Sequence, residues 1–234
     1  MSAAGADENA CGVCGGREFA HTAVLWPQLV AEWSLSSDEA AYIDVQQGTH
    51  CVSCSANVRS IALARAIVAA RGFNGPLTDF VADVGSQRVR LLEINTAGTL
   101  NAVLSRLPGH LLVSHPQCDM MNLTLADGAF DLVVHSDTLE HVIDPLQGLR
   151  ECRRVLAAEG ALVFTVPIVA GRLNRSRTGL PPSYHGEPGA AQSGMLVHTE
   201  FGADVWTLVM RAGFSRCELV SYRFPAGIAL VARS

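Results

Sequence analysis

Two pairs of cysteines near the N-terminus have the residue type and the spacing of a metal site. Cys11 and Cys14 form one C-x2-C pair, and Cys51 and Cys54 form the second. A C-x2-C turn aims two thiolates at one ion, and two such turns complete the tetrahedral set that holds structural zinc. Four thiolates leave no open coordination position, so we expect zinc to stabilise residues 11–54 rather than to catalyse a reaction. Unrelated reduced cysteines, or a redox C-x-x-C, are the alternatives.

The elements that follow alternate between short apolar runs and helical stretches. Four runs are rich in β-formers and read as buried parallel strands, at 88–94, 110–114, 130–136 and 161–166. Asp144-Pro145 begins a helix between the last two, with an apolar face that continues to Leu156 before Gly160, which makes a βαβ crossover. Further helices are expected at 55–71, 77–84 and 201–212, and final strands at 216–223 and 226–232.

Two motifs around the third of these strands resemble class I S-adenosylmethionine-dependent methyltransferases. Residues 127–142 read DGAFDLVVHSDTLEHV, and residues 149–156 read LRECRRVL. In that family FDLV is the fourth strand, LEHV lies beside the transferred methyl group, and the second motif leads into the fifth strand. The resemblance covers roughly 88–234. It implies an α/β fold, a Rossmann-like class I methyltransferase sheet with helices on both faces, preceded by a small zinc-binding module.

The turn after the first strand is where the cofactor is expected, because nucleotide-like ligands bind beyond strand ends in open α/β sheets. Glu93 would be the acidic anchor, and the small residues after it let the backbone approach a ligand. The family's E/D-x-G-x-G-x-G turn would place glycines where this sequence has Asn95, Ala97 and Thr99. Gly98 remains, out of register.

The second strand also departs from the family pattern. Ser114 and His115 stand where an acid normally binds the ribose hydroxyls, whereas Asp119-Met120 keeps the position of the acid beside the adenine. The short interval from Glu93 to Asp131 predicts that the helix between the second and third strands is trimmed or absent. The resemblance therefore implies these cofactor-binding residues: Glu93, Asn95, Ala97, Gly98, Ser114, Asp119, Met120 and Ser136.

His141 is the first candidate for catalysis. It follows the fourth strand at the carboxyl edge of the sheet, and its unperturbed pKa near neutrality suits a base that takes a proton from the acceptor. The alternative is a histidine that packs and orients the loop. Some relatives that methylate quinone precursors bind a divalent metal through this motif, so Asp137, Glu140 and His141 form a second metal hypothesis; Glu140 could equally cap the following segment.

Residues 167–200 show no clear periodicity and are too long for an ordinary connector, which is typical of a lid. Tyr184 and His185 are the candidates for catalysis here, and together with His198 they would line the acceptor pocket. Three arginines are available for an anionic substrate: Arg172, Arg175 and Arg177. The alternative is a solvated, irregular loop.

Composition excludes several classes of protein. The chain has 234 residues, 49% of them apolar and 17% charged, so it folds rather than remaining disordered. A net charge of −5, with basic residues in small groups, does not favour a nucleic-acid partner. The polar N-terminus lacks the pattern of a signal peptide, and no apolar run reaches the roughly 20 residues that span a bilayer. We expect a cytoplasmic protein without a membrane partner.

These observations divide the chain into a disordered N-terminus at 1–10, a zinc-binding module with a linking helix at 11–72, and a Rossmann-like methyltransferase domain at 73–234. The expected function is methyl transfer from S-adenosylmethionine to a small molecule, a sugar or a secondary-metabolite intermediate. The altered turn leaves two alternatives: a binding or scaffold protein that has lost the cofactor, or the same architecture used for an elimination, cyclisation or hydrolysis. A nicotinamide dehydrogenase is disfavoured, because no G-x-G-x-x-G follows the first strand.

Overall fold

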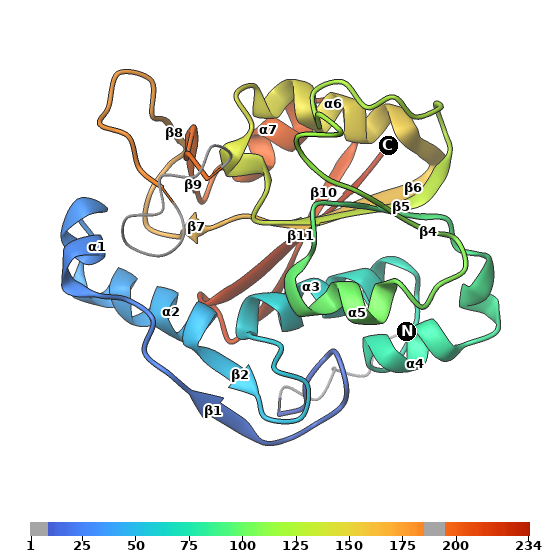
Figure 1. Ribbon diagram of the computed structural model, residues 1–234, viewed down its shortest axis with the longest axis horizontal. Coiled ribbons are helices and arrows are strands. Elements are labelled where there is room, and N and C mark those ends of the chain that lie inside the picture. Colours follow the sequence, from blue (N-terminus) through green and yellow to red (C-terminus); the bar gives the residue numbers. More distant parts are fainter. Residues whose placement is uncertain (1–8, 185–194) are drawn as a thin grey trace.

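A six-stranded, mostly parallel sheet is the centre of the computed structural model, which describes residues 9–184 and 195–234 (Figure 1). The strand order is β10-β11-β6-β5-β3-β4. The four parallel strands are β4 (His110–Val113), β3 (Leu91–Ile94), β5 (Phe130–Ser136) and β6 (Leu156–Thr165). The two antiparallel strands are β11 (Gly227–Arg233) and β10 (Arg216–Tyr222). The expected strands are thus confirmed.

One face of the sheet is covered by the helices before and just after β3 (Figure 1). Alanine-rich α3 (Val58–Ala70) packs across β11, β10 and β6, and nine of its residues are buried, because its small side chains allow close approach. Asn57 begins the helix by accepting the Ser60 N–H at 2.9 Å. Shorter elements complete this layer: α4 (Leu77–Ala82), η1 (Gly85–Arg88), η2 (Gly98–Leu100) and α5 (Asn101–Leu104).

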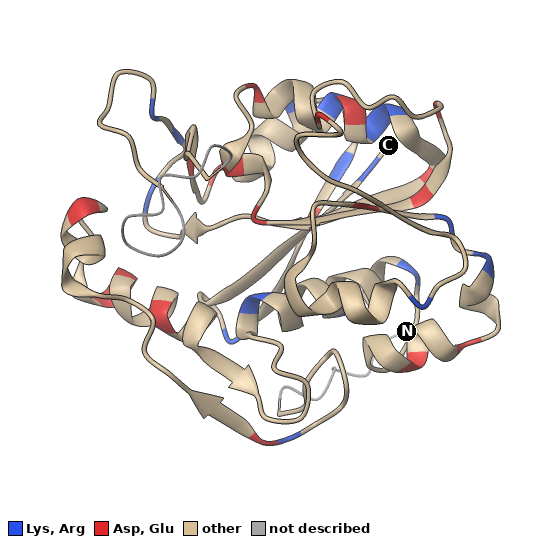
Figure 2. Cartoon of the chain, viewed as in Figure 1, with Lys and Arg blue, Asp and Glu red and all other residues tan. Residues whose placement is uncertain are grey.

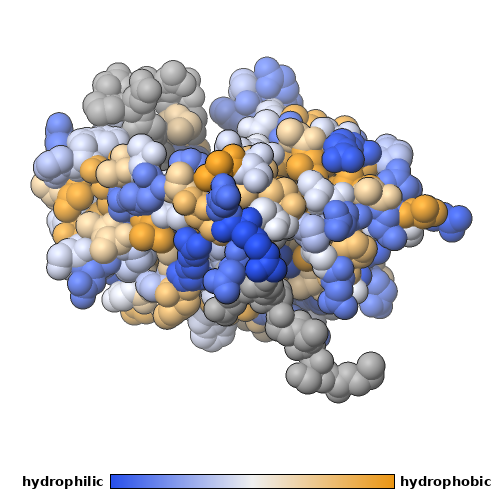
Figure 3. All heavy atoms as spheres, turned by 90° about the horizontal axis from the view of Figure 1, so that it is seen from below, coloured by the Kyte–Doolittle hydropathy of each residue, from blue (hydrophilic) through white to orange (hydrophobic). Residues whose placement is uncertain are grey.

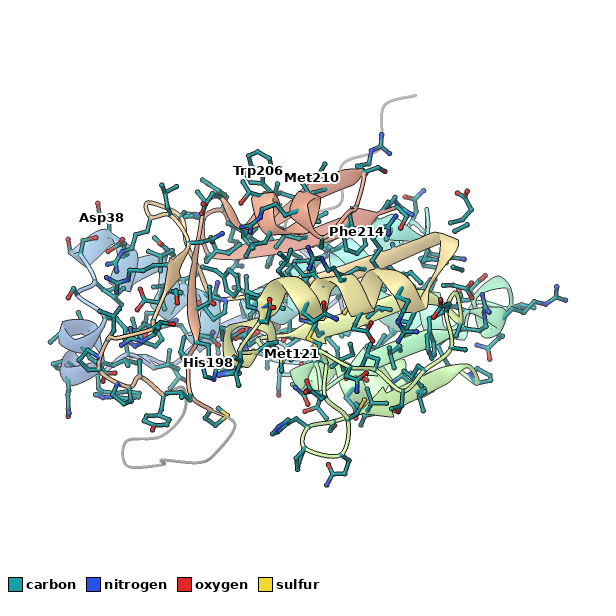
Figure 4. The ribbon with its side chains drawn as sticks, turned by 90° about the horizontal axis from the view of Figure 1, so that it is seen from above. Asp38, Met121, His198, Trp206, Met210 and Phe214 are labelled. Atoms are coloured by element: carbon teal, nitrogen blue, oxygen red, sulfur yellow. The ribbon has the colours of Figure 1, made fainter. Side chains whose placement is uncertain are left out.

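The opposite face is covered by α6 (Pro145–Val155) and α7 (Val205–Arg211) (Figure 1). Successive residues of β5 alternate between the two layers, as a strand buried on both faces requires: Val134 joins the α3 core and Val133 the α6–α7 core. On α7, Trp206 and Met210 point away from the sheet (Figure 4), and Trp206 is 47% exposed. Helices on both faces of the sheet are therefore confirmed.

The N-terminal part packs against the α3 layer and extends beyond it (Figure 1). A short hairpin pairs β1 (Phe19–His21) with β2 (Thr49–Cys51), and the chain between them forms α1 (Pro27–Glu32) and α2 (Ser37–Gly48). Cys11 and Cys51 belong to the same hydrophobic core as Leu91 and Val163 of the sheet. The boundary between residues 72 and 73 stays a prediction, and both sides of it share one core.

Three sequence-based expectations need correction. The helix between β5 and β6 ends at Val155, because Leu156 already pairs with Phe130 in the sheet. The helix expected at 201–212 begins only at Val205, because residues 199–202 form β9 (Thr199–Gly202). Residues 167–200 are also more regular than expected: β9 forms a small sheet with β7 (Ile168–Val169) and β8 (Arg175–Ser176).

The chain that follows β4 is irregular. Residues 114–129 are all described and contain neither helix nor strand, so the connection from β4 to β5 has no helix and β4 is an edge strand of the sheet. As a result, Leu111 and Leu112 of this edge strand are each 39% exposed. In the described part of the chain, no helix has the length and apolar character needed to cross a membrane.

Candidate functional site

The four predicted metal ligands converge on one point. The sulfur atoms of Cys11, Cys14, Cys51 and Cys54 all lie within 4.8 Å of one another, and none is in a disulfide. Cys11 Sγ lies 3.6 Å from Cys54 Sγ, and Cys14 Sγ lies 3.7 Å from Cys51 Sγ. A tetrahedron with zinc–sulfur bonds of about 2.3 Å has edges of about 3.8 Å. The cluster therefore has the size of a zinc site.

Local backbone geometry explains why the cluster forms. The two turns have the same hydrogen bond, Gly15 N–H to Cys11 O and Ser55 N–H to Cys51 O, both at 2.8 Å. Gly16 is required beside the sulfurs, because a Cβ there would lie 3.1 Å from the Sγ of Cys51 and 3.3 Å from that of Cys14.

A cavity of about 400 Å³ lies where the N-terminal helices meet the carboxyl ends of β5 and β6. Residues from α1, α2 and the segment before α1 form its apolar walls, with Trp26, Trp33 and Leu29 prominent among them. Pro167, which follows β6, and Ile168 of β7 also line the cavity, as does Tyr184. Parallel sheets bind ligands at their carboxyl edge, so this cavity is in the expected place.

The charged pair in the cavity is Arg59 of α3 and Asp137, which follows β5. Arg59 Nη1 donates to Asp137 Oδ2. Burial lowers the pKa of Arg59 to about 10, partly opposed by the nearby Glu140 carboxylate, so the guanidinium stays charged at neutral pH. Asp137 has a φ of 44°, a conformation that costs free energy for a residue with a side chain and that is often retained at functional sites. Sequence reasoning missed Arg59; the available signal was an arginine near the start of a largely apolar helix that contains only one other, Arg65.

The segment 167–184 is hydrogen-bonded to the N-terminal helices that line the cavity. Arg172 makes a double hydrogen bond to Glu39 of α2 at 2.8 and 2.7 Å, which lowers the pKa of Glu39 to about 2. The Trp33 indole donates to Ser183 Oγ at 3.0 Å, and the Ala170 N–H donates to Tyr42 Oη at 3.0 Å. This part of the segment expected to be a lid is therefore hydrogen-bonded to α2 and to the end of α1, and its role as a lid stays a prediction.

The three arginines that were expected to be available for an anionic substrate are instead paired with carboxylates of this chain. Arg172 pairs with Glu39, and both Arg175 and Arg177 pair with Glu200. The sequence could not reveal this, because the partners lie 133, 25 and 23 positions away.

The structure places Glu93 inside the protein rather than in an open crevice. Its side chain is fully buried, and its carboxylate accepts hydrogen bonds from the Ala97 N–H at 2.7 Å and the Asn101 amide at 2.9 Å. His110 Nε2 lies 2.6 Å from the same carboxylate. Glu93 therefore holds the turn after β3 and the neighbouring strand β4 together.

The turn after β3 uses the residues that tolerate its conformation. Its two left-handed positions are Asn95 (φ 54°) and Gly98 (φ 55°), whereas Ala97 has a φ of −78° and packs into the α3 core. Thr96 and Thr99 are exposed. A Cβ at Gly98 would meet only Ser60 Oγ, at 3.8 Å, so the backbone there is open to a ligand.

The other predicted cofactor residues lie at the same edge of the sheet but make different contacts. Ser114 follows β4 and is half-buried. Asp119 is exposed and accepts the Met121 N–H at 2.8 Å, while Met120 is buried against α6. Ser136 at the end of β5 shares a hydrogen bond with Thr165 at 2.9 Å. Their contact with a cofactor stays a prediction.

His141 is held by its surroundings and is not among the cavity-lining residues. Its Nδ1 lies 3.0 Å from Leu196 O, and its Nε2 lies 3.7 Å from Glu140. Asp137, Glu140 and His141 do not converge as ligands: among the described residues only the four cysteines form a metal-sized group, and Asp137 pairs with Arg59 instead. His198 donates its N–H to Glu140 O at 2.7 Å and lies beside this loop (Figure 4). His185 is outside the described residues.

His135 lies under the site, fully buried on β5 and stacked on Phe164 with ring centroids 4.8 Å apart. Both ring nitrogens are buried and find no hydrogen-bond partner within residues 9–184 and 195–234. Burial lowers the pKa of His135 to about 4, although the Glu140 carboxylate raises it somewhat.

This burial predicts an acid-sensitive component of stability. The unfolded chain binds a proton at His135 below about pH 6.5 and the folded chain only below about 4, so stability falls as the pH drops between these values. Between about pH 7.5 and 5 the loss is about 2 kcal/mol. Urea unfolding at both pH values should show this component in the wild type and not in His135→Leu. The exposed His115→Leu serves as control, and an unchanged pH dependence in His135→Leu would contradict the assignment.

Comparison with known proteins agrees with this architecture. Residues 67–164, from within α3 to β6, match the family model described as a methyltransferase domain. Over this segment the chain is therefore similar to a methyltransferase domain, and its α/β fold agrees with that similarity. The N-terminal helices that line the cavity lie outside the matched segment.

Solved structures with a similar fold include a methyltransferase from Thermotoga maritima, at 16% identity and a TM-score of 0.40, covering 70% of this chain and 91% of the other. The [4+2]-cyclase SpnF is 20% identical, with a TM-score of 0.39, and the alignment covers 69% of this chain and 73% of SpnF. The trans-methyltransferase CalH is 12% identical, with a TM-score of 0.40, and the alignment covers 87% of this chain and 60% of CalH. No curated protein matches the chain significantly.

Proposed function

We propose that the protein transfers a methyl group from S-adenosylmethionine to a small-molecule acceptor bound in the cavity. The observation that carries this proposal is the position of the cavity, which meets the carboxyl edge of a methyltransferase sheet at Asp137, one residue after β5. Asn95, Gly98 and Ser114 are the residues that would hold the cofactor at that edge, since the backbone at Gly98 is open. The bound sulfonium supplies an activated methyl group.

The charge distribution supports a small acceptor rather than a nucleic acid. Basic residues are distributed over separate elements (Figure 2), and several are neutralised by ion pairs, Arg90 with Asp131 and Arg154 with Glu151 among them. The face seen from below mixes polar and apolar residues (Figure 3). Binding to a phosphate backbone depends on clustered unpaired basic groups. An acceptor held inside the cavity agrees better with this surface.

Calorimetric titration with S-adenosylmethionine and with S-adenosylhomocysteine tests the proposal. We expect dissociation constants in the micromolar range. The absence of heat with both compounds, in protein whose folding has been confirmed by circular dichroism, would reject methyl transfer.

A second candidate is the same architecture without the cofactor, acting as a binding protein or in another reaction. Glu93 favours it, because the carboxylate expected to anchor the cofactor is instead fully engaged inside the protein. The same titration separates the two candidates, since only the first requires cofactor binding.

We also propose that the four cysteines bind one structural zinc ion. The support is their convergence within 4.8 Å on two turns of matching geometry. Zinc would join the turn at Cys11 and Cys14, which precedes β1, to the turn at Cys51 and Cys54, which lies between β2 and α3, and it would thus fix the base of the segment that contains α1 and α2. The metal would thus position the cavity wall rather than take part in the reaction.

A further inference from the structure

We infer that the acceptor is an apolar ring compound with one uncharged hydroxyl group, an alcohol or a phenol, whose hydroxyl binds at the polar end of the cavity against the Arg59–Asp137 ion pair. Its binding is a property of the cavity alone. Its methylation, with Asp137 as the proton acceptor, rests on the proposed function.

The first step concerns the cavity walls. Trp26, Leu29 and Trp33 form one side, and Ile43 and Ile168 extend the apolar surface from α2 and β7. Such a surface stabilises apolar rings by burying their area and by stacking.

The second step concerns the polar groups on these walls, which are mostly engaged. The Gln46 amide donates to Ala226 O at 2.6 Å, and the Gln47 amide donates to Gln46 Oε1 at 3.3 Å. The Trp33 indole N–H donates a hydrogen bond to Ser183 Oγ. A sugar would bury several hydroxyl groups against walls that offer them few partners, and each unpaired group is costly. The lining therefore favours a ligand with few polar atoms.

The third step concerns the polar end of the cavity. The Asp137 carboxylate accepts hydrogen bonds only, and the Arg59 guanidinium only donates them. A hydroxyl group can satisfy both, donating to Asp137 and accepting from Arg59. A carboxylate ligand would meet the negative charge of Asp137, and a hydrocarbon would bury the pair without replacing its contacts with water. An uncharged hydroxyl fits this end best.

The same contacts define the reaction. The hydroxyl oxygen forms a bond to the methyl carbon as the carbon–sulfur bond breaks, and the bonding electron pair stays on sulfur, which leaves as an uncharged thioether. The hydroxyl proton passes to the Asp137 carboxylate. Asp137 is better placed for this than His141, because Asp137 lines the cavity whereas His141 Nδ1 is engaged with Leu196 O.

Calorimetry on the full chain with three probes tests the inference: 2-naphthol, 2-methylnaphthalene and 2-naphthoate. We expect naphthol to bind about 10-fold or more tightly than the other two, since a hydrogen bond to a charged group contributes about that factor. Asp137→Asn removes the negative charge that faces Arg59 within the cavity, so we expect the preference to invert toward naphthoate. Equal binding of the three probes to the wild type, or no binding, would overturn the inference.

Two further variants make the outcome specific. Asp131→Asn is the matched control, because Asp131 lies on the same strand β5 and pairs with Arg90, away from the cavity. It should keep the wild-type preference; an inversion there would contradict the role of Asp137. Leu29→Trp fills the cavity without touching the ion pair and should abolish naphthol binding even if Asp137→Asn fails to fold.

The two proposals can fail separately. If S-adenosylmethionine binds but naphthol does not, the inference about the acceptor is wrong and the proposed function stands. Naphthol binding without any cofactor binding keeps the assigned cavity chemistry and rejects methyl transfer.

Discussion

Replacing Cys51 with alanine is expected to lower the free energy of unfolding by at least about 5 kcal/mol and to release the metal. Structural zinc sites contribute about 10 kcal/mol or more to the folding of small domains, which is comparable with the whole stability of an ordinary protein. Cys51 is fully buried within the main core, so a lost ligand also leaves the sheet-facing layer poorly packed. Chemical denaturation followed by circular dichroism gives the stability, and elemental analysis should give about one zinc per wild-type chain.

Cys152→Ala is the control for this experiment. Cys152 is also fully buried, but it lies on α6 in the opposite core and outside the cluster. Its replacement should leave the zinc content unchanged and cost only the small penalty of a minor cavity. Wild-type protein that is purified without chelator, contains no zinc and is as stable as zinc-loaded protein would reject the metal proposal.

Replacing Glu93 with alanine is expected to lower the free energy of unfolding by about 3–5 kcal/mol, because one partner of a buried, hydrogen-bonded pair is removed. His110 and Asn101 would lose the carboxylate that they contact, and the turn after β3 would lose its link to the Ala97 N–H. Urea unfolding measures the effect. Glu218→Ala on β10 is the control, since Glu218 is half-exposed and its loss should cost little.

The result also decides the role of Glu93. A variant that keeps wild-type stability but loses affinity for S-adenosylmethionine would contradict the structural role and restore Glu93 as a cofactor anchor. The expected result, a large loss of stability, places its main effect on the fold.

The sheet and its helices could be predicted from the sequence because their signals are local. Runs such as 130–136 are apolar on both faces, and Asp144-Pro145 marks the start of a helix within a few residues. The convergence of the four cysteines could be predicted for the same reason, since each C-x2-C turn is complete within four residues. Periodicity was weaker at 199–212, where Thr199 to Gly202 pair with other segments before α7 begins.

The cavity could not be predicted, because it depends on contacts between residues far apart in the chain. Arg59 and Asp137 are separated by 78 positions, and Arg172 meets Glu39 across 133. The role of Glu93 was missed for a similar reason: its partner His110 stands in the adjacent strand, where only the fold reveals it. Family patterns pointed to the carboxyl edge of the sheet, where a cavity lies, but did not give the partner of each side chain.

The hairpin β1–β2 has a consequence for how acceptor choice could change. The segment that lines much of the cavity leaves the body of the protein after His21 and returns at Thr49, residues that pair with each other. It is thus a long loop whose two ends are held together by the pairing of β1 with β2, next to the cysteine cluster. A segment of different length and sequence could be grafted between these two points without altering any strand of the six-stranded sheet. Acceptor choice could therefore change through this loop while the six-stranded sheet stays the same.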